Sequence, residues 1–189
     1  MDIKPGSFLL TSCVGGTDTN WRNQLLGKSI LNFQEVGELD GEANFSHAEI
    51  IVDDKGSTFA ARWRTREREP SKGLDAYIGS NVMIVEPKYK KDFSSIYKSV
   101  KEKFDGEIYP VHRLLMQGVS KLIFPWIVKI NLFGMGICSE VVGYAGMIGG
   151  LFAYWKGMTP AILENEFRNR PSVFRIVYEG DFSGIEKYL

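Results

Sequence analysis

A short turn between two apolar segments is the feature that most restricts what this chain can fold into. The turn Asp53-Asp54-Lys55-Gly56 separates Ala48–Val52, which is apolar apart from Glu49, from Ser57–Trp63. Two such segments joined by a short loop that contains glycine pair as a β-hairpin. The chain is therefore expected to build an antiparallel sheet that includes this hairpin.

Further strands and helices are expected on both sides of the hairpin. Short apolar segments predict strands at Ser7–Ser12, Asn81–Glu86 and Ser172–Tyr178. Helical spacing or helix-start signals predict helices at Thr19–Leu31, Phe93–Phe104, Val111–Leu122, Cys138–Met147 and Ala161–Arg168. The last of these follows Thr159-Pro160, an N-cap residue and a proline at the first helical position. The charged stretch Arg62–Lys72 is expected to be a solvated edge or loop rather than an anion site.

These elements predict an α+β fold, in which a small, mostly antiparallel sheet packs against helices. The chain has 189 residues, of which 44% are hydrophobic, and this is enough for one substantial core. No change in composition marks a second unit, so residues 1–189 are expected to form a single domain.

Composition excludes several classes of function. Lys and Arg number 23, as do Asp and Glu, so the net charge is zero and no nucleic-acid partner is expected. The two cysteines, Cys13 and Cys138, do not make a disulfide framework, and with His47 and His112 they do not match the spacing of a zinc site. No metal or organic cofactor is therefore expected.

The most apolar region, residues 122–154, is too interrupted to predict a transmembrane helix. Lys129, Asn131, Ser139 and Glu140 break it into pieces shorter than the ~18 apolar residues that a span needs. We expect buried core there, and the alternative for residues 122–133 is a surface that contacts lipid or a membrane. The start of the sequence shows no secretory signal, which predicts a cytoplasmic protein or one delivered by a phage.

Cys138 is the first candidate for chemistry. It lies in GMGICSEVVGYAG, where glycines precede an apolar helical pattern, so the thiol is expected at a helix N-terminus. There the helix dipole and free backbone N–H groups stabilise a thiolate, and the same N–H groups can hold an oxyanion. The alternative is an inert cysteine that fills core space, since free cysteine is among the most buried residue types.

His47 and Glu49 can complete a catalytic set with this thiol. A nucleophilic cysteine needs a base, and His47 opens a predicted strand, whereas His112 has no evident partner. Residues two apart on a strand point to the same face, so Glu49 is expected on the side of His47, where it can orient the imidazole. The alternative for Glu49 is a solvated carboxylate, or one paired with an arginine of the neighbouring strand such as Arg62.

The order of these motifs resembles that of the permuted papain-like amidases, the YiiX-like branch of the NlpC superfamily, which includes relatives of lecithin–retinol acyltransferase. The similarity runs from Lys4 to Gly180 and is carried by KPGSFLL, SHAEIIVDDKG, CSEVVGYAG, TPAILE and FRIVYEG. The resemblance implies a circularly permuted papain-like fold in which the strand with the histidine precedes the helix with the cysteine. It implies Cys138 as the nucleophile and His47 as the base.

One position departs from the family pattern. A polar third residue is often found on the following strand, about where this chain has Ala60 and Ala61, so Glu49 is the candidate for that role. We therefore expect a cysteine amidase or peptidase with a Cys-His dyad or Cys-His-Glu triad, acting on a cell-wall peptide or an N-acyl, lipid-like amide. The alternative is an inactive papain-like module that binds an acyl chain or a peptide.

Overall fold

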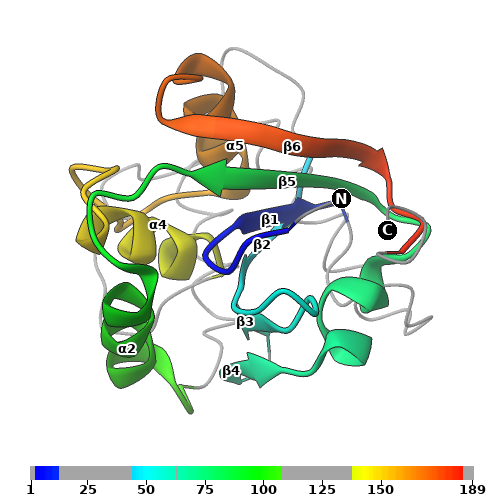
Figure 1. Cartoon of the computed structure of the whole chain (residues 1–189), viewed down its shortest axis with the longest axis horizontal. Coiled ribbons are helices and arrows are strands. Elements are labelled where there is room, and N and C mark those ends of the chain that lie inside the picture. Colours follow the sequence, from blue (N-terminus) through cyan, green and yellow to red (C-terminus); the bar gives the residue numbers. More distant parts are fainter. Residues whose placement is uncertain (1–2, 13–43, 63, 108–137, 185–189) are drawn as a thin grey trace, which may run out of the picture.

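A six-stranded antiparallel sheet organises the computed structural model, which describes residues 3–12, 44–62, 64–107 and 138–184. The strands are β1 (Phe8–Thr11), β2 (His47–Ile51), β3 (Thr58–Ala61), β4 (Thr65–Arg68), β5 (Asn81–Pro87) and β6 (Phe174–Asp181). Their order across the sheet is β4-β3-β2-β1-β5-β6, so β4 and β6 form the two edges (Figure 1). Every neighbouring pair is antiparallel, and the α+β class expected from the sequence is confirmed.

The predicted hairpin is present as β2 and β3. Ile50 pairs with Phe59 and Ile51 with Thr58. In the turn, a carboxylate oxygen of Asp53 accepts hydrogen bonds from backbone N–H groups two and four residues later. Gly56 has a φ of 90°, a conformation that favours glycine, and this explains the residue type at that point of the loop.

The charged stretch after the hairpin differs in part from the expectation. It contains an edge strand, β4, followed by two short 3₁₀ helices, η1 (Pro70–Lys72) and η2 (Leu74–Tyr77). Most of β4 is exposed, as expected for a solvated edge. The expectation is wrong for Arg62, whose side chain is only 12% exposed because it forms an ion pair with the buried carboxylate of Glu49.

Three α-helices were predicted nearly to the residue: α2 (Phe93–Phe104), α4 (Cys138–Ile148) and α5 (Pro160–Asn169). Side chains cap two of them, since the Asp92 carboxylate accepts from Ser94 N–H and the Thr159 hydroxyl oxygen accepts from Ile162 N–H. The predicted helices at residues 19–31 and 111–122 lie outside the described residues. Among the described helices, none has the length and apolar character needed to cross a membrane.

The two faces of the sheet bury different clusters, as the two-residue alternation of strands requires. One face is covered by α2, α4 and α5, and residues such as Leu10 and Ile50 belong to that core. The other face buries Leu9 and Ile51 against Leu74 and Tyr77 of η2. The short 3₁₀ segment is therefore what closes the second face near the start of β2.

Candidate active site

Cys138 is the first residue of α4 and lies against β2, far from it in sequence. Its side chain is buried, with 3% of the residue exposed. β3 pairs with β2 at Ile50 and Ile51, and the backbone N–H of Ala48, on the same side of β2, bonds to the Cys138 sulfur. The N–H of Ser139 bonds to this sulfur as well. The thiol therefore sits between a helix N-terminus and a strand amide, both of which favour its anionic form.

His47 connects this thiol to a carboxylate. Its Nε2 lies 3.0 Å from Oε1 of Glu49, and its side chain also hydrogen-bonds to that of Cys138. Since Nε2 is engaged by Glu49, the ring nitrogen that serves the sulfur is Nδ1. His47 and Glu49 are both buried, and they share a face of β2 as predicted from their spacing. The three residues singled out from the sequence thus form one chain of contacts.

Glu49 binds more than the histidine. Its Oε1 accepts hydrogen bonds from Arg62 Nε at 2.9 Å and from the Tyr77 hydroxyl at 2.6 Å, and Arg62 Nη2 lies 2.8 Å away. The pairing with Arg62 and the orientation of His47, which were alternatives from the sequence, therefore coexist on one oxygen. Tyr77 was missed, because nothing in LDAY marks a residue of a 3₁₀ helix that folds under β2.

The charges of this cluster stabilise one another. Burial alone would raise the pKa of Glu49, but Arg62 and His47 lower it far below its usual value. Burial alone would lower the pKa of His47, yet Cys138 and Glu49 raise it from 6.5 to about 9. For Cys138 the effect of burial is again opposed by His47 and by the two backbone N–H groups, and the thiol pKa is lowered. These directions favour a thiolate facing an imidazolium.

The start of α4 is held in place by the loop that follows the helix. The Ser139 hydroxyl donates a 2.6 Å hydrogen bond to the Met158 carbonyl, and Gly157 N–H donates a 2.7 Å bond to the Glu140 carboxylate. Ser139 and Glu140 are both buried. The two residues after the cysteine therefore anchor the first turn of the helix, which fixes the direction of the thiol.

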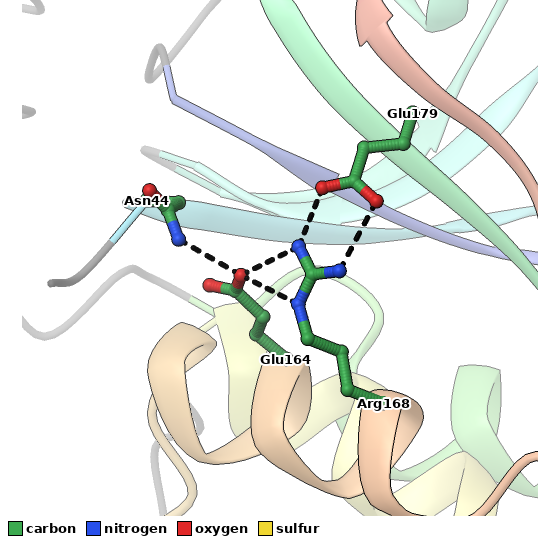
Figure 2. Close-up of polar contacts among 4 residues, drawn as sticks. All are labelled: Asn44, Glu164, Arg168 and Glu179. Atoms are coloured by element: carbon green, nitrogen blue, oxygen red, sulfur yellow. Dashed lines mark hydrogen bonds and ion pairs between the residues drawn. The ribbon is translucent and has the colours of Figure 1, made fainter. Parts of the chain in front are cut away.

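A second polar cluster holds the chain just before β2. Glu164 and Arg168 of α5 form an ion pair, Arg168 also pairs with Glu179 of β6, and Asn44 donates a 2.9 Å bond to Glu164 (Figure 2). Asn44 lies three residues before His47. The cluster therefore ties the approach to the histidine strand to a helix and a strand near the end of the chain.

Other sequence candidates contribute nothing that can be described. Cys13, His112 and the apolar segment 122–133 lie outside the described residues, so the lipid contact proposed for that segment stays a prediction. Ala60 and Ala61 are buried on β3 and carry no polar group toward the imidazole. Among the described residues, no three His, Cys, Asp or Glu side chains gather in a way that would hold a metal ion.

Comparison with known proteins gives one distant likeness. No family model matches the chain, and no curated protein matches it. Among solved structures, the chain is similar to the metalloprotein YiiX from Escherichia coli O157:H7, with a TM-score of 0.46 and 10% sequence identity. The alignment covers 93% of this chain and 89% of that one. Membership of the NlpC superfamily and a permuted papain-like arrangement remain predictions from the sequence.

Proposed function

We propose that this protein is a cysteine hydrolase that cleaves an amide bond through an acyl-thioester on Cys138. The observation that carries the proposal is the contact chain from Cys138 through His47 to Glu49, with the thiol at a helix N-terminus. A nucleophile, a base within hydrogen-bond reach and a group that orients the base are the parts that nucleophilic acyl transfer needs.

The steps follow from these roles. The Cys138 thiolate attacks the substrate carbonyl carbon, and the backbone N–H groups at the start of α4 hold the negative charge that develops on the oxygen. The C–N bond breaks as the His47 imidazolium gives its proton to the leaving amine. Neutral His47 then takes a proton from water, the hydroxide attacks the thioester carbon, and the acid leaves as Cys138 regains its starting state.

Glu49 takes the third role in this scheme. It accepts from Nε2 of His47, and this leaves Nδ1 directed at the sulfur. The carboxylate also stabilises the positive charge on the imidazole, as the third member of a catalytic triad does. The substrate class follows the resemblance and the apolar segment 122–133: a cell-wall peptide, or an N-acyl, lipid-like amide.

The test begins with acylation, because it does not require the natural substrate. The protein is mixed with p-nitrophenyl esters of short and long acyl chains, and a burst of p-nitrophenol is measured together with the mass of the intact protein. We expect an acyl adduct on Cys138 that is absent from Cys138→Ala and present in Cys13→Ser.

Amide cleavage is then measured with peptidyl and N-acyl p-nitroanilides that share the acyl groups that react best. A folded protein that forms no adduct with any ester would contradict the proposal and favour the non-catalytic binding module. Faster turnover of long-chain acyl anilides than of peptidyl anilides would assign the lipid-like class, and the reverse would assign the peptide class.

A further inference from the structure

One oxygen of Glu49 receives every described hydrogen bond to that carboxylate. His47, Arg62 and Tyr77 all meet Oε1, while Oε2 is buried with no hydrogen-bond partner among the described residues. The three partners come from different elements: β2 itself, the residue after β3, and η2. The carboxylate is therefore shared between a histidine on one side and an arginine on the other.

The charges in this cluster alternate along the line of contacts. The Cys138 thiolate faces the His47 imidazolium, which faces the Glu49 carboxylate, which faces the Arg62 guanidinium. Without the arginine, one imidazolium would have to balance two buried anions. A buried excess of negative charge takes up a proton, and the thiolate is the more basic of the two anions.

The remaining groups that face the carboxylate do not replace Arg62. Tyr77 is a neutral donor, because burial and the Glu49 charge raise its pKa well above 10. Arg68 of β4 is close enough to interact with Glu49 electrostatically, but it makes no described hydrogen bond to it. An arginine stays charged at every relevant pH, so Arg62 is the permanent counter-charge in direct contact with the carboxylate.

We infer that Arg62 is a positioning residue that acts through Glu49, balancing its charge so that the thiolate and the carboxylate can both flank one imidazolium. It thereby sets how far into acid Cys138 stays a nucleophile. This deepens the proposed function and rests on it, because it explains how a third acidic residue coexists with a reactive thiolate. The arginine itself lies beyond the contact of His47 with the sulfur.

The experiment measures the rate of Cys138 alkylation by iodoacetamide against pH, in a Cys13→Ser background, so that only one thiol reacts. The readout is the pH at the midpoint of the acid limb, where the thiolate becomes protonated. Arg62→Met removes the counter-charge but keeps an aliphatic side chain, and we expect its midpoint to rise by about one pH unit or more. On that limb, one unit is a tenfold slower reaction at fixed pH.

Two further variants make the prediction an ordering. Glu49→Gln removes an anion and leaves excess positive charge, so its midpoint should fall below that of the wild type. The double variant Arg62→Met/Glu49→Gln removes one charge of each sign, and its midpoint should return close to the wild-type value. A purely structural role for Arg62 would not predict a return on adding a second substitution. If Arg62→Met does not fold, the order of the other three proteins still tests the inference.

Matched controls are Arg68→Met and Arg175→Met. Arg68 faces the same cluster without a hydrogen bond to Glu49, and Arg175 pairs with Glu86 in a distant part of the sheet. Equal shifts in Arg62→Met and Arg68→Met would overturn the inference, as would a midpoint in Arg62→Met that matches the wild type. If the wild-type thiol itself reacts with an ordinary midpoint near ~8.5, both the inference and the proposed function are wrong. A low wild-type midpoint that Arg62→Met leaves unchanged would remove the inference alone.

Discussion

Glu49 accepts a hydrogen bond from His47, which lies two residues before it on the same strand and points to the same face. A strand places alternate side chains together without help from any other element. The base and the residue that orients it are therefore positioned by a single strand, β2. The nucleophile comes from α4, about ninety residues later, so tertiary packing has only one contact to establish between the two parts.

Replacing Cys138 by alanine should abolish acylation and hydrolysis while the fold is retained. The side chain is small and its removal leaves little cavity, so we expect the free energy of unfolding to change by less than about 1.5 kcal/mol. Burst kinetics and urea denaturation measure the two effects. Cys13→Ser serves as the control and should keep wild-type acylation. A loss of acylation in that control would assign the nucleophile to the other thiol.

Amide hydrolysis should decline as the pH rises through about 9, the value to which the pKa of His47 is raised. Above it the imidazolium is lost, and an amide needs that proton for its leaving amine, whereas p-nitrophenolate leaves without one. The kcat/KM for a p-nitroanilide should therefore fall in this range while acylation by the matching p-nitrophenyl ester persists. Parallel profiles for both substrates would argue against His47 as the proton donor.

Substituting Glu49 by glutamine should slow amide turnover by about 10²-fold or more, because the imidazole loses its charged orienting partner. The buried Arg62 is then left without a counter-charge, which we expect to lower the free energy of unfolding by about 3 kcal/mol at pH 7. Kinetics and urea denaturation on the same preparation separate these effects. Arg62→Met added to Glu49→Gln should recover stability but not turnover.

The destabilisation by Glu49→Gln should shrink in acid. The pKa of Glu49 is lowered in the folded protein, so the ionised carboxylate contributes stability that is fully present above its ordinary value of 4.5. This contribution is lost as the pH falls toward the folded value. The difference in unfolding free energy between wild type and variant should therefore be constant from pH 6 to 7 and decrease below about pH 4.5. A difference that grows in acid would contradict the lowered pKa.

Alanine at Gly146 should destabilise the protein, although alanine is the better helix former by about 1 kcal/mol. A Cβ at this position would lie 2.3 Å from Cδ2 of Phe152, a ring that stacks on Phe174. Overpacking of this kind costs about 1–3 kcal/mol. Thermal unfolding should show a lower Tm for Gly146→Ala, and Phe152→Leu in the same chain should restore part of it. A higher Tm for the single variant would show that the ring moves aside freely.

Local patterns in the sequence were sufficient for most elements of this fold. The hairpin follows from Asp53–Gly56, and α5 follows from Thr159-Pro160, because turns and caps depend on residues within a few positions of one another. The edge strand β4 was missed because its side chains are charged and it gains strand structure by pairing with β3. The two 3₁₀ segments carry no pattern that distinguishes them from loop.

The sequence by itself determined the three candidate residues, since the spacing of His47 and Glu49 and the glycines before a cysteine are local features. Only the tertiary structure decided that Cys138 meets His47, and that Arg62 and Tyr77 converge on the same oxygen of Glu49. Those contacts join β2 to a helix, to the end of β3 and to η2. They depend on how the two faces of the sheet are covered, and no short stretch of sequence encodes that packing.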